Sequence, residues 1–194
     1  MTRLRETKPV TVGWCVWVTG LPGSGKSVVS EALLTLLEQK DVRAQLLSSD
    51  RLRKVITPRP TYSLGERDIV YEGLVYIAEL LTHNGVNVII DATGNLRRYR
   101  DQARKQIPRF IEAYLKCPME ICVEREKKRR RTFFAPTEIY SKASKGQAST
   151  VPGVGQPYEE PLNPEIVLDG SNCSAKDCAA RILKAIEQMN AENK

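Results

Sequence analysis

The feature that most limits what this chain can fold into is the octapeptide Gly20-Leu21-Pro22-Gly23-Ser24-Gly25-Lys26-Ser27. It fits the pattern G-x-x-x-x-G-K-[ST], and it stands between an apolar stretch at 14–19 and a helical apolar pattern that begins at Val28. A strand, this turn and a helix, in that order, form the context in which the pattern binds phosphate. Its glycines allow a tight turn whose backbone N–H groups point inward, and the helix N-terminus adds a positive dipole end. We therefore predict a nucleotide phosphate site at residues 20–28.

Two side chains of this loop have predicted chemical roles. Lys26 is expected to reach the β- and γ-phosphates, and the hydroxyl of Ser27 is expected to coordinate magnesium. ATP with Mg²⁺ is the expected cofactor, although the pattern by itself does not distinguish ATP from GTP. The predicted nucleotide-binding residues are Gly20, Leu21, Pro22, Gly23, Ser24, Gly25, Lys26, Ser27 and Val28.

Apolar, β-branched segments alternate with helical periodicity along the chain. The predicted strands are 14–19, 44–49, 86–92, 109–116 and 165–169. The predicted helices bury Val28, Val29, Ala32, Leu33, Leu36 and Leu37, then Ile69, Leu74, Ile77, Ala78 and Leu81, and finally Cys178, Ile182, Ile186 and Met189. This alternation predicts an α/β fold, a doubly wound parallel sheet of about five strands with helices on both faces. At 194 residues the chain fits one domain, 1–194.

Composition narrows the class of protein further. No apolar run is long enough to span a membrane and no apolar signal core precedes the first strand, so we expect a cytoplasmic protein. Five cysteines without a C-x-x-C pair favour buried thiols over a disulfide framework. The net charge is +7, and the segment 124–131 concentrates much of it. That basic run fits either a solvated helix end or a surface that faces phosphate.

Carboxylates follow two of the predicted strands, beside the phosphate loop. Asp50 ends "LLSSD" and Asp91 ends "NVIID". Either side chain could hold magnesium or accept the proton of an attacking hydroxyl, because phosphoryl transfer depends mainly on positioning and charge stabilisation. A helix N-cap is the alternative role for Asp50. Arg53 and Arg67 are candidate anchors for an anionic acceptor, since guanidinium groups bind phosphate or sulfate bidentately.

Beyond these motifs, the chain from about residue 14 to 190 resembles the adenylylsulfate kinase family. The resemblance is carried by "GLPGSGKS", "SDRLR", "YSLGERDIVY" and above all "IYSKASKGQASTVPGVGQPYEEPLNPEIVLDG". It implies a P-loop kinase that phosphorylates the 3′-hydroxyl of adenosine 5′-phosphosulfate (APS), and it implies a homodimer. The acceptor-side residues that it implies are Asp50, Arg53, Tyr62, Arg67, Lys142 and Gly153, to which the strand pattern adds Asp91. The motifs together predict Lys26 and Asp50 as catalytic residues and Ser27 and Asp50 as metal ligands.

The sequence also departs from the family pattern. Val70 stands where an asparagine is usual, Val151 stands where a stacking phenylalanine is usual, and "DATGN" at 91–95 replaces a Ser-Pro-aromatic element. Phe133 or Phe134, in an insertion, is a candidate replacement for the missing ring. These departures keep two alternatives open: a kinase of the same fold for another nucleotide derivative or a 5′-hydroxyl nucleic-acid end, and a non-catalytic nucleotide-binding regulator. The loop-rich segment 126–164 is predicted to be a lid over both substrates.

Overall fold

The computed structural model describes residues 11–129, 136, 138–146 and 150–192. Its strands are β1 (Cys15–Thr19), β2 (Ala44–Ser48), β3 (Asn87–Asp91), β4 (Phe110–Lys116) and β5 (Ile166–Asp169). Its helices are α1 (Lys26–Glu38), α2 (Ser49–Ile56), α3 (Leu64–His83), α4 (Arg97–Gln106), α5 (Met119–Lys128), α6 (Ile139–Ser144) and α7 (Ala175–Glu192). The five predicted strands are confirmed to within two residues at each end.

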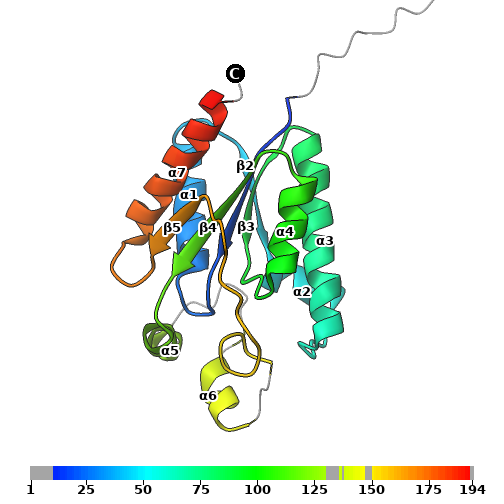
Figure 1. The fold of residues 1–194 in the computed structure, drawn as a ribbon, viewed down its shortest axis with the longest axis vertical. Helices are drawn as coiled ribbons and strands as arrows, with labels where there is room; N and C mark the ends of the chain where they lie inside the picture. The colour runs from blue at the N-terminus through cyan, green and yellow to red at the C-terminus, as the bar shows by residue number, and fades with distance from the viewer. Residues whose placement is uncertain (1–10, 130–135, 137, 147–149, 193–194) are drawn as a thin grey trace, which may run out of the picture.

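All five strands are parallel, in the order β2-β3-β1-β4-β5, and helices cover both faces of the sheet (Figure 1). Along β1 the side chains alternate between the two faces, as the strand period of two requires. Val16 and Val18 pack with α1 and α7, whereas Cys15 and Trp17 pack with α3 and α4. The predicted doubly wound α/β fold is confirmed. No helix in the described part of the chain is long and apolar enough to cross a membrane.

Two predicted core positions are wrong. Val28 is 49% exposed and Ile69 is 59% exposed. Val28 follows the phosphate loop directly and faces the cavity described below. In α3 the buried stripe runs through Val70, Leu74 and Ala78, which turns Ile69 toward solvent. Because several apolar residues of α3 lie outside that stripe, the sequence pattern alone gave the helix the wrong rotation.

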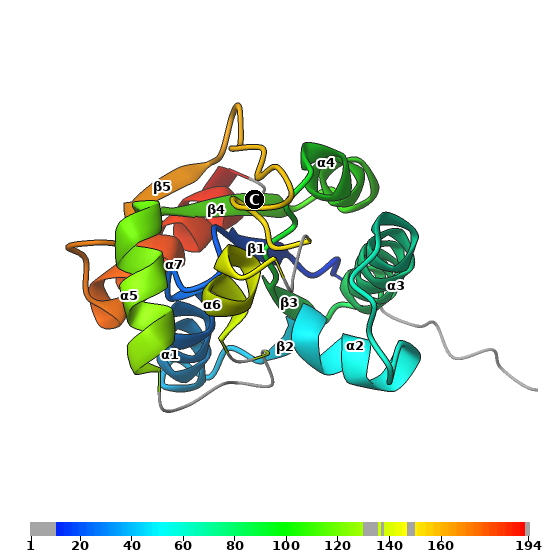
Figure 2. The ribbon, with the colours of Figure 1, turned by 90° about the horizontal axis from the view of Figure 1, so that it is seen from below.

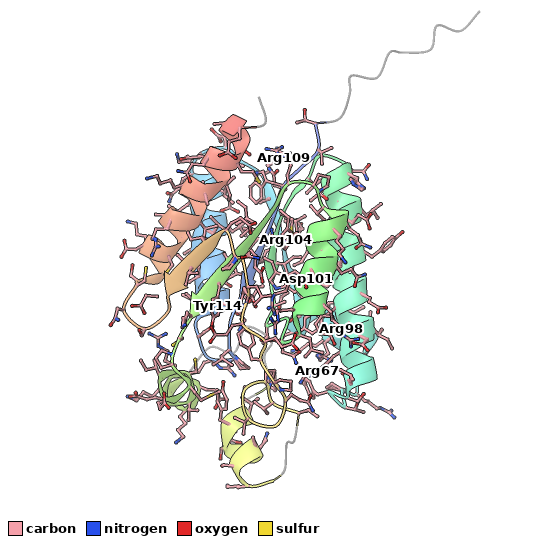
Figure 3. The ribbon with its side chains drawn as sticks, in the orientation of Figure 1. Arg67, Arg98, Asp101, Arg104, Arg109 and Tyr114 are labelled. Carbon is pink, nitrogen blue, oxygen red and sulfur yellow. The ribbon has the colours of Figure 1, made fainter. Side chains whose placement is uncertain are left out.

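The parallel arrangement brings the carboxyl ends of the strands to one edge of the sheet, where open α/β sheets bind their ligands. Asp91 at the end of β3 lies in register with Val18 of β1 and Ser48 of β2. Helices α5 and α6 lie at this edge, and Figure 2 shows α5 and α2 on opposite sides of α6. Arg67 also lies at this end of the molecule, whereas Arg109 lies at the opposite end (Figure 3).

Candidate active site

The phosphate loop connects β1 to α1 and has the backbone geometry that its glycines allow. Gly25 is the N-cap of α1 with a φ of 106°, a region that other residues rarely adopt. Gly23 has a φ of 82°, and a Cβ built on it would lie 2.4 Å from the carbonyl oxygen of Cys122. The contact between this loop and α5 therefore requires glycine at position 23. The Nζ of Lys26 is buried in the same turn and donates to the carbonyl of Leu21 at 2.9 Å.

A cavity of about 670 Å³ opens beside this loop at the carboxyl edge of the sheet. That is within the usual size range for small-molecule sites. Twelve of the predicted site residues line it: Pro22, Gly23, Gly25, Lys26, Ser27, Val28, Asp50, Arg53, Tyr62, Arg67, Asp91 and Lys142. The fold thus brings the predicted nucleotide residues and most of the predicted acceptor residues to one cavity.

The other predicted residues lie outside the cavity wall. Gly20, Leu21 and Ser24 belong to the phosphate loop but do not line the cavity. Gly153 lies behind the loop, where an added Cβ would approach the side chains of Met119 and Leu21 at 2.3 and 2.9 Å. The backbone of Gly153 therefore packs closely against the side chains of Leu21 and Met119. A contact between Gly153 and a substrate stays a prediction.

Charge is distributed unevenly around the cavity. Among the described residues, its wall carries six cationic side chains, Lys26, Arg53, Arg67, Arg125, Arg129 and Lys142, against three carboxylates, Asp50, Asp91 and Glu126. A surplus of cations in a concave site attracts anions and raises their local concentration. The cavity is therefore suited to anionic, phosphate-bearing ligands.

Burial is the largest cause of the pKa shifts of Lys26, Asp50 and Asp91. It lowers the pKa of Lys26, against the opposing effect of Asp91 and Asp50. It raises the pKa of Asp50 above the ordinary 3.8, opposed by Lys26 and Arg53, and raises that of Asp91, opposed by Lys26 and by a hydrogen bond from Ser27. Desolvated groups whose pKa values shift toward neutrality are typical of sites that transfer protons or phosphoryl groups.

Helix capping is not the role of Asp50. The N-cap of α2 is Ser48, whose hydroxyl accepts a hydrogen bond from the backbone N–H of Arg51 at 3.4 Å. Asp50 instead lies within the first turn of α2 and faces the cavity. This removes the structural alternative that the sequence left open for this carboxylate.

The two predicted acceptor arginines are buried, and each is held by its neighbours. Arg53 forms an ion pair with Glu66, and its guanidinium lies 4.7 Å from the ring centroid of Tyr62. Arg67 donates to the carbonyl of Tyr62 at 3.1 Å and to that of Thr150. Arg67 thereby links the start of α3 to the chain that follows α6.

The structure also shows where two residues that depart from the family pattern, Val70 and Val151, lie. Val70 is fully buried in the core, so it does not reach the cavity, whereas Tyr71 beside it does. Val151 lines the cavity and packs in a small apolar cluster with Cys117, Cys122 and Tyr140. Phe133 and Phe134 lie outside the described residues.

The basic run is only partly described, because Arg130 and Arg131 lie outside the described residues. Lys127 is exposed, and Lys128 is also exposed, forming an i,i+4 ion pair with Glu124 at 2.6 Å. Arg129 lines the cavity and donates to the carbonyl of Pro136 at 2.6 Å.

Sequence reasoning assigned no role to several further cavity residues, among them Tyr71 and Arg125. Tyr71 lines the cavity and accepts a hydrogen bond at its hydroxyl from the backbone N–H of Gly94 at 3.0 Å. Arg125 donates to the carbonyls of Ser24 at 3.3 Å and Gly170, which joins the phosphate loop to the turn after β5. Tyr71 ends the stretch "YSLGERDIVY" and Arg125 lies in the basic run 124–131, but nothing in either pattern indicates these contacts, which are made to residues far away in the sequence.

The glycine-rich loop, the parallel sheet in this strand order and the cation-rich cavity together define a P-loop phosphotransferase. Residues 12–169 match the family model for adenylylsulphate kinase. The chain belongs to the adenylylsulfate kinase family.

Individual relatives agree with this assignment. The chain is 34% identical to a probable adenylyl-sulfate kinase of Archaeoglobus fulgidus, over 81% of this chain and 96% of the relative. It is 30% identical to a probable adenylyl-sulfate kinase of Pyrococcus abyssi, over 91% of this chain and 97% of the relative. Among solved structures, the APS kinase of Mycobacterium tuberculosis in complex with AMPPNP and APS superposes with a TM-score of 0.80. Its sequence identity is 29%, and the match covers 91% of this chain and 98% of that one.

Proposed function

We propose that this protein transfers the γ-phosphate of MgATP to the 3′-hydroxyl of APS and so forms 3′-phosphoadenosine 5′-phosphosulfate. The observation that carries the proposal is the shared cavity, in which the phosphate loop faces Asp50, Arg53, Arg67 and Lys142. Family membership supports the acceptor, and the M. tuberculosis relative, solved with AMPPNP and APS, supports a site for two nucleotides.

The chain's own groups divide the work of phosphoryl transfer. Backbone N–H groups of residues 20–28 hold the phosphates of ATP, and the ammonium of Lys26 stabilises charge on the transferred group. Asp50 lines the same cavity and interacts electrostatically with both Lys26 and Arg53, and its role is to orient the acceptor hydroxyl and take its proton. Arg53, Arg67 and Lys142 bind the anionic groups of APS, and the ring of Tyr62 stacks on its base.

The residues present fit a magnesium ion. The hydroxyl of Ser27 lies within hydrogen-bonding reach of the Asp91 carboxylate, and Asp50 shares the same cavity. Within the described residues, no group of three or more His, Cys, Asp or Glu could hold a metal alone. Magnesium ordinarily binds through one or two carboxylates together with substrate phosphates, so Ser27, Asp50 and Asp91 are sufficient. When bound, the ion neutralises charge that develops on the transferred phosphate.

We further propose one kinase domain, 1–194, with a lid within 126–164. Closure of such a segment brings cations to the phosphates and keeps water from hydrolysing ATP. The position of Arg129 in the cavity wall supports a role for the lid in phosphate binding. The cytoplasmic location rests on the sequence, and the homodimer rests on the family resemblance. An exposed apolar stripe on α3, formed by Ile69, Tyr76 and Leu80, is available for a second copy.

A coupled assay for ADP release tests the function. We expect turnover with ATP and APS, and none above background with AMP, with other nucleotide derivatives or with a 5′-hydroxyl oligonucleotide. Turnover with one of the other acceptors in preference to APS would replace the proposed acceptor. Binding of ATP without turnover on any acceptor would favour the regulator.

A further inference from the structure

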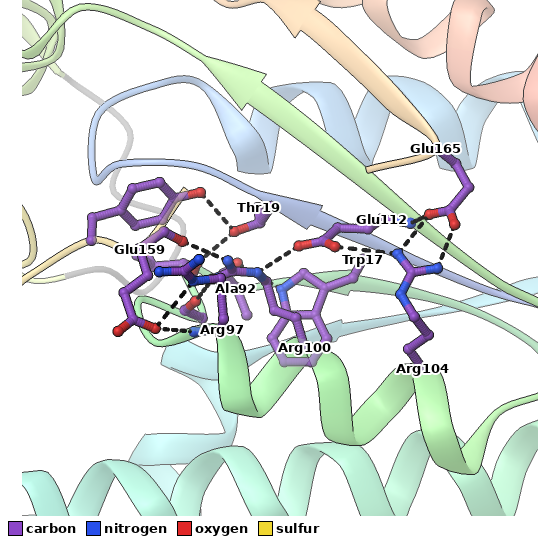
Figure 4. Close-up of polar contacts among 12 residues, drawn as sticks. Trp17, Thr19, Ala92, Arg97, Arg100, Arg104, Glu112, Glu159 and Glu165 are labelled. Carbon is purple, nitrogen blue, oxygen red and sulfur yellow. Dashed lines mark hydrogen bonds and ion pairs between the residues drawn. The ribbon is translucent and has the colours of Figure 1, made fainter. Parts of the chain in front are cut away.

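Beneath the cavity lies a buried polar cluster that none of the roles above uses (Figure 4). Its centre is Arg100 of α4, which is 1% exposed. Arg104, one turn further along α4, contacts Glu112 of β4 at 3.2 Å and also pairs with Glu165. Glu112 is itself buried, and its backbone N–H donates to Glu165 at 2.7 Å. Fully buried arginine is uncommon, so its partners indicate what it holds in place.

The guanidinium of Arg100 contacts three separate segments of the chain. Its Nε donates to Oε1 of Glu112 at 2.6 Å, its Nη1 donates to the carbonyl of Gly94, and its Nη2 donates to the carbonyl of Glu159 at 2.6 Å. Only the first partner is charged. The other two are backbone carbonyls, one in the loop after β3 and one in the segment 157–160, so this side chain fixes backbone positions.

The loop after β3 forms one wall of the cavity. Asp91, Ala92 and Thr93 line the cavity directly before Gly94. The carbonyls of Ala92 and Thr93 accept hydrogen bonds from Trp17 at 2.9 Å and from Thr19 at 2.7 Å. With Arg100 on the Gly94 carbonyl, three consecutive peptide groups have fixed orientations, and the part of the wall formed by Ala92 and Thr93 depends on them. Asp91 is held separately, by the pairing of β3 with its two neighbouring strands.

The second segment, residues 157–160, is joined by a short turn to residues 150–152, which form another wall of the cavity. Thr150, Val151 and Pro152 line the cavity, and a compact turn joins them to residue 157. In that turn the carbonyl of Val151 accepts from the backbone N–H groups of Val154, Gly155 and Gln156. The position of 157–160 therefore determines the position of 150–152, whose Thr150 carbonyl accepts from Arg67.

Additional hydrogen bonds join the two segments side by side. The backbone N–H of Glu159 donates to the carbonyl of Asn95 at 2.8 Å, and the side chain of Asn95 donates to the carbonyl of Pro157 at 3.1 Å. The Glu159 carboxylate accepts from the backbone N–H of Arg97 at 2.8 Å. Two side chains also tie both segments to the sheet. Arg100 does so through Glu112, and Thr19 of β1 does so because its hydroxyl donates to the Thr93 carbonyl at 2.7 Å and lies 3.0 Å from the hydroxyl of Tyr158.

We propose that Arg100 is a positioning residue for phosphoryl transfer, because its guanidinium sets the spacing between residues 92–93 and residues 150–152, two walls of the cavity. This inference rests on the proposed function, since its consequence concerns the acceptor. The phosphate loop has its own contacts with α5 and Arg125, so the nucleotide side is independent of Arg100. Small displacements of substrate-positioning groups are costly, because reacting atoms must lie in near-attack geometry.

The matched substitutions Arg100→Lys and Arg104→Lys test this inference. Lysine keeps the charge but replaces the planar fork with a point charge, so it cannot reach Glu112 and both carbonyls in the same geometry. For Arg100→Lys we expect the KM for APS to rise roughly tenfold, the effect of one lost charge-assisted hydrogen bond, with the KM for ATP within about twofold of wild type. Arg104→Lys changes the same ion-pair cluster but contacts neither wall segment, so its KM for APS should stay near that of wild type.

Hydrogen exchange of the ligand-free protein gives a readout that does not depend on activity. Arg100→Lys should raise exchange at the backbone amides of 94–97 and 158–160, and Arg104→Lys should not. Equal effects of the two substitutions on the KM for APS, or an unchanged KM in Arg100→Lys, would overturn the positioning role. If Arg100→Lys does not fold, Asn95→Ala, which removes one bond between the same segments, must raise the KM for APS for the inference to stand. A wild-type protein that does not use APS would instead contradict the proposed function.

Discussion

Replacing Arg53 separates its part in the fold from its part in acceptor binding. Its ion pair with Glu66 joins side chains that are 7% and 10% exposed. Removal of one partner of such a pair costs about 3–5 kcal/mol, because a desolvated charge is left behind. The Glu66 carboxylate keeps hydrogen bonds from the backbone N–H and hydroxyl of Thr61 at 2.5 and 2.8 Å, so Arg53→Met should cost about 3 kcal/mol, the lower end of that range.

For a chain of this length, that loss lowers the melting temperature by about 6–12 °C. The double variant Arg53→Met/Glu66→Gln should recover part of the loss, because no unpaired charge remains. Urea denaturation of the four proteins of the cycle, without ligands, measures this coupling.

The KM values for APS and ATP then test whether Arg53 binds the acceptor. Within the described part of the chain, the Nε of Arg53 is buried without a hydrogen-bond partner, and the side chain lines the cavity. We expect Arg53→Met and the double variant to raise the KM for APS at least about tenfold, with little change in the KM for ATP, and Glu66→Gln to leave both nearly unchanged. A loss of ATP affinity equal to the loss of APS affinity would show that Arg53 only maintains the cavity wall. A rise in the KM for APS in Glu66→Gln as large as that in Arg53→Met would also show that Arg53 only maintains the cavity wall.

Three further outcomes follow from the site. Lys26→Ala should reduce kcat by at least about 100-fold while circular dichroism shows an intact fold, and near-normal turnover would remove the kinase assignment. If Asp50 is the base, kcat/KM for APS should fall as the pH drops through its pKa, which burial raises above 3.8, because a base acts in its deprotonated form. The variant Asp50→Asn should be slow at every pH, and its kcat/KM should not fall further at low pH. If the fall at low pH survives in this variant, another group is responsible for it. Segment 126–164 should be cleaved by protease more slowly when AMPPNP and APS are both present, and unchanged cleavage would argue against the lid.

Local patterns were sufficient to predict the sheet and the nucleotide side of the site. The strands have strong apolar β-branched runs, and the phosphate loop is one continuous octapeptide whose glycines adopt the predicted turn. Asp50 and Asp91 were also found, because the carboxyl ends of parallel strands share one edge of the sheet.

Longer-range contacts could not be found in the same way. The ion pairs of Arg100 and Arg104 could not be predicted, because their partners Glu112 and Glu165 lie elsewhere in the sequence. The rotation of α3 depends on Trp17 and Tyr99 on the facing surface, with which Tyr71 stacks, so Ile69 was placed wrongly. The position of Gly153 depends on the side chains of Met119 and Leu21.

The contact between Glu159 and the start of α4 has a consequence for the order in which the molecule matures. The N-cap of α4 is Leu96, which supplies no side-chain cap, and the first backbone N–H of the helix donates to a carboxylate 62 residues further along the chain. During synthesis α4 leaves the ribosome before Glu159 exists, so its first turn begins with unsatisfied donors. The first turn of α4 and the loop of Gly94 therefore reach their final form only after residue 159 has emerged, which makes this wall of the active site a late product of translation.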